Sequence, residues 1–179
     1  MKKLLSLSAL VALLSLPALA VPFTLDTANS KVDFAIKHLK LTQVDGKFTQ
    51  FSGTIDFDID AKQLKVLNGE VEVASVDTDN QKRDDHLRAP DIFDAQKYPK
   101  ITFTMTKAEN NKIYGDLTIR DKTKSITLDA KQIYNNGVLQ IEATSKIKRS
   151  DFDVVWESNL QDSLVGDDLT IKLNLIAKQ

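Results

Sequence analysis

Apolar and polar residues alternate one by one along much of this chain, and no other feature constrains its fold as strongly. Ile101, Phe103 and Met105, for example, are separated by threonines. Because successive side chains of a β-strand point to opposite faces, this period of two gives a strand one apolar and one polar face. Eight segments carry the pattern strongly, and 23–26 carries it weakly. The eight are 32–36, 55–59, 71–73, 101–105, 113–119, 126–128, 139–147 and 169–175.

The order of these segments favours an all-β fold with antiparallel strands. Short polar turns, such as Asn110-Asn111 and Asn135-Asn136-Gly137, separate several of them. Helical segments do not alternate with the strands, which argues against a parallel sheet. One-sided strands of this number can close into a barrel or stack as a sandwich. A barrel of about eight strands has an interior that side chains fill or that holds one small ligand.

Two stretches interrupt the alternation and indicate longer connections. The first runs from about 83 to 97, where we expect a short helical segment capped by Asp91 and ended before Pro99. The second, 150–168, contains Phe152 and the only tryptophan, Trp156. Long connections in a compact β-domain often carry function, so both are candidate parts of a binding site.

The first twenty residues have the composition of a secretory signal. Lys2 and Lys3 precede an apolar run over 4–16, and Ala18-Leu19-Ala20 supplies small residues for a signal peptidase. The apolar run is shorter than the ~20 residues that a helix needs to cross a bilayer. We therefore predict cleavage after Ala20, export to the periplasm, and one domain over 21–179.

The composition excludes several classes of function. The formal net charge is −1 at pH 7, so the charge balance does not indicate a nucleic acid or an anionic membrane surface as partner. The chain has no cysteine, which removes disulfides, thiolate nucleophiles and Cys-based metal sites. It also lacks GxSxG, HExxH and glycine-rich phosphate-binding motifs. We therefore expect no metal and no cofactor.

Three polar residues continue the apolar phase of a predicted strand, namely His38, Ser75 and Arg149. An inward guanidinium is costly unless it has a partner. Arg149 therefore either pairs with a carboxylate at the barrel rim, where it closes the structure, or contacts the polar end of a ligand. We favour the first interpretation, because strand ends are the least certain part of such a prediction.

The two histidines, His38 and His86, are the only imidazoles. With Asp84 and Asp85 they suggest a metal site, but the spacing does not bring His38 close to the others. Hydrogen bonds from His86 and Asp84 that hold a helical turn against the barrel are the favoured interpretation.

Several short motifs occur in an order that resembles the YceI family. The central ones are Ser75-Val76-Asp77-Thr78, Arg83-Asp84-Asp85-His86-Leu87, Phe93-Asp94, Tyr98-Pro99 and Ile101-Thr102-Phe103. The flanking ones are Phe34 with His38, Gly115-Asp116-Leu117-Thr118 with Thr123-Lys124, Arg149 with Asp151-Phe152, and Val165-Gly166-Asp167. Each motif is weak alone, but their common order and spacing extend from about Leu25 to the C-terminus.

The resemblance implies a single antiparallel eight-stranded, lipocalin-like barrel around a long tunnel for an apolar lipid. The lipid would be a polyisoprenoid, an isoprenoid quinone or a fatty amide. The expected apolar lining, mostly from the inward phase of the strands, is Phe34, Ile36, Phe57, Val73, Phe93, Phe103, Leu117, Ile141, Trp156 and Leu173. The polar residues expected to orient the ligand or brace the fold are His38, Arg83, Asp84, His86 and Arg149. For Asp84 we favour bracing.

We therefore expect a periplasmic carrier or reservoir for a long apolar lipid. The alternative is an enzyme that acts on a lipid or quinone, with His86 or His38 as the acid–base group. A third hypothesis is a structural barrel that binds a membrane partner. The resemblance implies a membrane di-haem cytochrome as a partner, and a dimer is the oligomeric state we consider.

Overall fold

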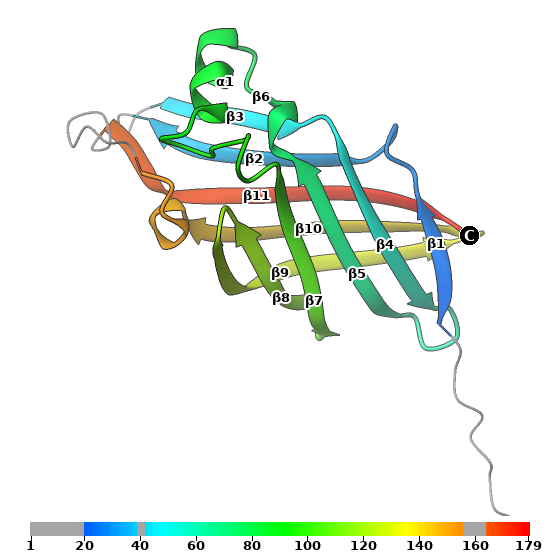
Figure 1. Cartoon of the computed structure of the whole chain (residues 1–179). Helices are drawn as coiled ribbons and strands as arrows, with labels where there is room; N and C mark the ends of the chain where they lie inside the picture. The colour runs from blue at the N-terminus through cyan, green and yellow to red at the C-terminus, as the bar shows by residue number, and fades with distance from the viewer. Residues whose placement is uncertain (1–19, 39–41, 156–163) are drawn as a thin grey trace, which may run out of the picture.

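The alternating segments pair as antiparallel strands that close on themselves (Figure 1). The structure, a computed structural model, describes residues 20–38, 42–155 and 164–179. The ring consists, in spatial order, of β1 (Val21–Leu25), β4 (Phe51–Asp58), β5 (Gln63–Glu72), β7 (Lys100–Glu109), β8 (Lys112–Ile119), β9 (Lys122–Asn135), β10 (Val138–Lys148) and β11 (Val165–Lys178). It closes where Thr24 and Leu25 of β1 pair with Lys178 and Ala177 of β11. The predicted eight-stranded antiparallel barrel is confirmed.

Three further strands extend the wall of the barrel. They are β2 (Lys31–His38), β3 (Thr42–Phe48) and β6 (Val76–Asp77), which follow β11 in the order β11–β2–β3–β6. Because β10 pairs along one edge of β11 from Asp168 to Lys178, β2 and β1 share its other edge. The barrel wall therefore continues from β11 into β2, β3 and β6, which lie beside the helix α1 (Figure 1).

The helix α1 (Gln81–Arg88) begins earlier and is shorter than predicted. The Asn80 side chain accepts a hydrogen bond from the main-chain N–H of Arg83, so Asn80 caps the helix in place of the predicted Asp91. Pro90 follows the last turn and is incompatible with a continued helix, and the chain to Tyr98 forms turns. Neither α1 nor any other helix in the described ranges is long and apolar enough to cross a bilayer.

The sequence analysis missed one strand, and its prediction for Ser75 was wrong. The strand β3 was not predicted, because Asp45, Gly46 and Lys47 interrupt the apolar pattern within it. Ser75 does not continue β5 inward, because Val73–Ser75 form a 3₁₀ turn, η1. In that turn the Ser75 hydroxyl donates to the carbonyl oxygen of Glu72 at 2.7 Å and accepts from the N–H of Gln50 at 3.1 Å.

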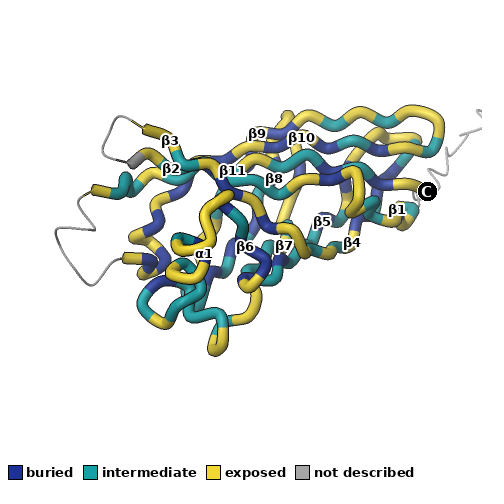
Figure 2. Tube along the Cα trace, turned by 90° about the horizontal axis from the view of Figure 1, so that it is seen from above, coloured by how far each residue is buried: buried dark blue, intermediate teal, exposed yellow. Residues whose placement is uncertain are grey.

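Apolar side chains fill one half of the barrel interior, which we call the packed half. Figure 2 shows the buried and exposed positions that alternate along its strands. Its members are Phe23, Ile55, Phe57, Leu64, Leu67, Ala108, Ile113, Leu128, Ala130, Leu139, Ile141, Ala143, Leu175 and Ala177. The rings of Phe23, Phe57 and Tyr134 meet there with centroids 5.7 to 6.1 Å apart. Such contacts contribute about 0.5–1.5 kcal/mol each beyond burial, so this end of the barrel is a conventional protein core.

Candidate functional site

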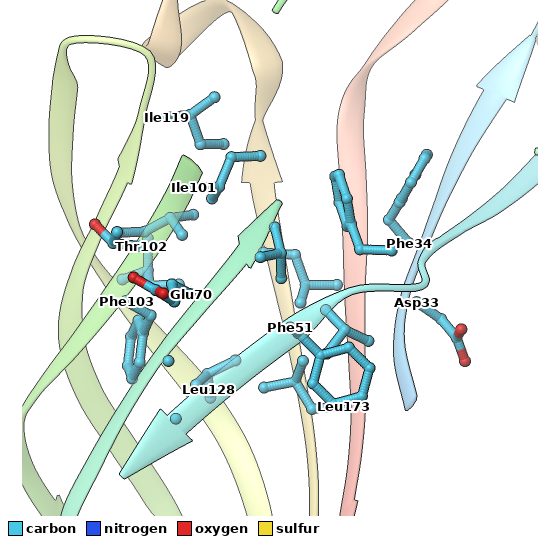
Figure 3. Close-up of a pocket in the computed structure, with 18 of the residues that line it drawn as sticks. Asp33, Phe34, Phe51, Glu70, Ile101, Thr102, Phe103, Ile119, Leu128 and Leu173 are labelled. Atoms are coloured by element: carbon cyan, nitrogen blue, oxygen red, sulfur yellow. The ribbon is translucent and has the colours of Figure 1, made fainter. Parts of the chain in front are cut away.

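The other half of the barrel holds a cavity of about 170 Å³. Residues of β1, β2, β3, β4, β5, β7, β8, β9, β10 and β11 border it, and most of them are apolar (Figure 3). The polar ones are Asp33, Ser52, Asn68, Glu70, Thr102 and Arg149. Of the two acidic residues at the cavity, Asp33 and Glu70, Glu70 stands at an outward position of β5. There Lys100 and Ser52 donate to its carboxylate at 2.6 and 3.2 Å. The hydrogen bond from Lys100 holds the pKa of Glu70 below its usual value. The interior surface is therefore suited to an apolar guest.

The packed half forms one end of the cavity. Ile55, Leu67, Leu128 and Leu175 belong to the packed half and also line the cavity. On β4, the next inward residue beyond Ile55 is Phe57, which is 1% exposed and does not reach the cavity. The cavity is thus closed at this end by packed side chains, and we call this boundary the floor.

Two phenylalanine rings of the cavity wall lie directly over glycines of neighbouring strands. A Cβ atom at Gly115 would lie 2.3 Å from the Phe103 ring, and a Cβ atom at Gly46 would lie 2.3 Å from the Phe34 ring. A glycine in a strand permits such a close approach because it has no side chain. Phe103 also packs against the packed half and against the buried cluster that contains Leu117 and Ile119. Its ring therefore forms part of the floor.

The distal end of the cavity, away from the floor, is lined by Phe93, Arg149 and Val154. Arg149 begins the 3₁₀ turn η2 (Arg149–Phe152) and is only 6% exposed. Its guanidinium donates to the carbonyl oxygens of Val154 at 2.8 Å, Gly166 at 3.0 Å and Val165 at 3.1 Å. Arg149 therefore ties the chain that follows η2 to the start of β11, beside the cavity.

The Arg83 and Asp84 side chains converge on Thr78 and brace α1. The buried Asp84 carboxylate accepts from the N–H of Thr78 at 3.0 Å and from its hydroxyl at 2.5 Å. Arg83 donates to the hydroxyl oxygen and the carbonyl oxygen of Thr78 at 2.7 and 2.8 Å. These contacts fix α1 to the chain that leaves β6, and neither residue borders the cavity.

The two histidines lie at different places. His86 is on α1, with its side chain 44% exposed and its Nε2 2.8 Å from a carboxylate oxygen of Asp91. His38 ends β2, where its backbone pairs with Val165, and its side chain lies outside the described part of the structure. His86 does not border the cavity.

Comparison with known families identifies the fold. Residues 23–177 match the YceI-like domain. The chain belongs to the YceI-like family. The resemblance that the motifs indicated is confirmed across nearly all of the described residues.

Two relatives of this YceI-like chain represent different bacteria. Protein YceI of Escherichia coli O157:H7 is 35% identical over 149 residues, which cover 76% of this chain and 78% of that protein. UPF0312 protein SA2479 of Staphylococcus aureus strain N315 is 37% identical over 116 residues, which cover 65% of this chain and 66% of that protein. This chain thus spans just under two thirds of the staphylococcal relative.

Three solved structures share the barrel of this YceI-like chain. The YceI protein of Campylobacter jejuni has a TM-score of 0.70 and 38% identity, with 87% of this chain and 96% of that chain covered. BcnA of Burkholderia cenocepacia has a TM-score of 0.77 and 30% identity, with 85% and 98% covered. A polyisoprenoid binding domain from Saccharophagus degradans has a TM-score of 0.66 and covers 87% and 97%. It is 14% identical, which shows the fold alone.

The apolar residues predicted for the site divide between the cavity and the core of this YceI-like barrel. Phe34, Phe93, Phe103, Leu117 and Leu173 line the cavity. Phe57 and Ile141 lie in the packed half instead. Val73 is buried in η1, and Ile36 is half-buried on β2, so neither borders the cavity. Trp156 lies outside the described residues.

Other lining residues of the YceI-like cavity were not singled out from the sequence. They include Val71, Ile101, Ile119, Ile126, Leu128 and Ile171. Each stands in a segment whose alternation is visible in the sequence, so its inward phase could have been inferred. The glycines under Phe34 and Phe103 carry no such signal, because the ring that covers each one comes from another strand.

Proposed function

We propose that this YceI-like barrel binds the apolar tail of a lipid in its cavity and acts as a carrier or reservoir. The observation that carries the proposal is the cavity itself, which has apolar walls and a packed floor. A concave apolar site with few polar groups is the usual form of a small-molecule site. Burial contributes about 0.8 kcal/mol for each CH₂ group removed from water, so one C5 unit contributes a few kcal/mol.

The cavity volume limits how much of a lipid is enclosed. A core cavity of about 150 Å³ binds one benzene-sized molecule, and the volume here is about 170 Å³. A C5 isoprenoid unit has nearly as many carbon atoms as benzene, so the cavity accommodates about one or two such units. A longer lipid would insert the end of its tail, and its remaining length would extend past the distal end or widen it.

A polyisoprenoid or isoprenoid quinone is the lipid class that we favour, ahead of a fatty amide. The support is the solved polyisoprenoid binding domain of Saccharophagus degradans, which has the same fold. The polar head of the lipid would lie at the distal end, near Arg149, because the floor is entirely apolar. The other polar candidates, Arg83 and Asp84, brace α1 and do not border the cavity.

An enzyme with a histidine acid–base group is the alternative. Among the described side chains, His86 is partly exposed beside Asp91 and does not border the cavity. This position gives His86 as an acid–base group no support, and the side chain of His38, the other candidate, lies outside the described residues. We therefore propose binding without turnover.

We also propose that the protein acts in the periplasm after removal of residues 1–20. The support is the Lys2-Lys3, Leu-rich and Ala18-Leu19-Ala20 sequence. Intact-mass measurement of exported protein should give a chain that begins at Val21, and retention of the first twenty residues would contradict the proposal. The di-haem cytochrome partner and the dimer stay predictions.

Lipid extraction tests the proposed function directly. Protein purified from its native host should release a lipid on organic extraction, identified by mass spectrometry. Ile171→Gln places an amide in the cavity wall, and an unpaired buried polar group costs about 1–3 kcal/mol, so the affinity for the lipid should fall by roughly five- to 150-fold and the bound lipid with it. Lys172→Gln, at the neighbouring exposed position, is the matched control. Equal lipid content in the two variants, or none in the wild type, would overturn the proposal.

A further inference from the structure

The barrel has a solid half and a hollow half, and the boundary between them is sharp. Along β8, Leu117 lines the cavity and Ile113, two inward positions further on, is fully buried in the packed half. Along β9, Leu128 belongs to both regions, whereas Ala130 belongs to the packed half alone. An apolar chain that extends through the cavity toward the packed half therefore meets packed side chains at a defined depth.

We infer that this floor measures the length of the bound apolar chain, and that Phe103 is the residue that sets its depth. The inference rests on the proposed function and adds a specificity-determining residue to it. Phe103 lines the cavity, and its ring packs against both the packed half and the cluster at the cavity wall. Figure 3 shows Phe103 and Leu128 below Ile101 and Ile119, along the wall of the cavity.

Gly115 makes Phe103 the decisive floor residue. It occupies the inward position of β8 between Leu117 and Ile113, so no side chain fills that level of the strand. The Phe103 ring fills it instead, since a Cβ atom at Gly115 would be 2.3 Å from that ring. Removal of the ring would consequently open space that is continuous with the cavity. That space is about the size of benzene, or roughly one C5 unit.

Chain length and affinity are connected through burial. Each CH₂ group that leaves water raises the affinity by roughly fourfold. Once a chain extends from the floor to beyond the distal end, further units stay in solvent and the gain stops. The length at which affinity stops rising is then the length that the barrel measures.

The test uses all-trans polyprenyl alcohols that differ by one C5 unit, titrated into lipid-free protein with displacement of the apolar dye ANS as the readout. For wild type we expect the affinity to rise with length and then level off. For Phe103→Ala the affinity should stop rising at a chain that is one C5 unit longer. At that additional length the variant should bind at least about tenfold more tightly than wild type.

Ile141→Ala is the matched control. Ile141 is fully buried in the packed half and does not border the cavity, so its truncation also removes apolar contacts but leaves the floor in place. The chain length at which its affinity stops rising should equal that of wild type. If Phe103→Ala does not fold, Leu128→Ala tests the same floor from β9 and should also move the levelling to a longer chain.

The possible results separate the two proposals. The floor does not measure chain length if affinity stops rising at the same chain length in wild type, Phe103→Ala and Leu128→Ala. The same conclusion holds if Ile141→Ala shifts that length as much as they do. In both cases the binding function stands. A wild-type protein that binds no member of the series overturns the lipid-binding function and the length measurement together.

Discussion

The most informative single substitution in this protein is Arg149→Met, because it removes the three described hydrogen bonds of the guanidinium and keeps an aliphatic side chain of similar length. The guanidinium joins the carbonyl oxygens of Val154, Val165 and Gly166 beside the cavity. A buried acceptor left without a donor costs about 1–3 kcal/mol. The three carbonyl oxygens share one donor group and the chain can relax, so we take about 1 kcal/mol for each. The free energy of unfolding should therefore fall by about 3 kcal/mol.

Thermal unfolding of lipid-free protein measures this effect. For a domain of this size each 1 kcal/mol corresponds to about 2–4 °C, so the Tm should fall by about 6–12 °C. Lys148→Met, at the adjacent exposed position of β10, removes a positive charge without a buried bond and should stay within about 0.5 kcal/mol of wild type. A decrease of less than about 2 °C for Arg149→Met would refute the conclusion that these three bonds hold the chain at the cavity.

The same variant distinguishes bracing from ligand contact. If Arg149 only joins η2 to β11, folded Arg149→Met binds a polyprenyl alcohol as tightly as wild type. If Arg149 also donates to the head of the lipid, the loss of that charge-assisted bond lowers affinity by roughly ten- to a hundredfold. The hydrogen bonds to Val154, Val165 and Gly166 favour bracing, which is the role that the sequence favoured, although the described acceptors are main-chain carbonyls rather than a carboxylate.

Two further predictions concern the ends of the barrel. Asp84→Asn should lower the free energy of unfolding, measured in urea, by about 1.5–3 kcal/mol, because the buried carboxylate accepts two hydrogen bonds from Thr78. Asp85→Asn, at the exposed neighbouring position, should have a much smaller effect. Equal losses in the two variants would contradict the role of Asp84 as a brace for α1. The hydrogen bond from Lys178 lowers the pKa of Asp26, so its stabilising contribution is present above the unfolded pKa and is lost as pH falls through the folded pKa. Asp26→Asn should therefore flatten the loss of stability below about pH 4, measured by urea unfolding across pH, and an unchanged slope would disprove the coupling.

The barrel could be predicted from local pattern, whereas its interruptions could not. The alternation around Phe103 or Ile141 identifies a strand and its inward face, because period two is a property of the strand itself. The start of α1 depends on one side chain, Asn80, which carries the cap. Asp91 is an equally good cap by residue type, so sequence alone could not choose between them. The strand β3 is held by its partner β2 and not by its own weak pattern.

The role of a polar motif is also decided by partners that lie outside the motif. Arg149 lies inward, as its phase indicates, but two of its three acceptors among the described residues, Val165 and Gly166, lie at the start of β11. Arg83 and Asp84 bind Thr78, several residues before them and outside any helical spacing. Residue type and phase thus identify groups that need a partner, and the fold determines which partner they find.

The division of the barrel into a packed half and a hollow half is the feature that matters most for function, and period two contains no information about it. Phe57 and Phe103 occupy equivalent inward positions in strongly alternating strands. Phe57 meets Phe23 and Tyr134 and is 1% exposed, whereas Phe103 lies on Gly115 with the cavity on its other side. Alternation specifies the face of a strand, but depth along the barrel axis depends on strand tilt and stagger, which bring distant residues to the same level. A length limit for the ligand is therefore a property of the assembled layers, and Phe103 with Gly115 is where a single substitution can move it.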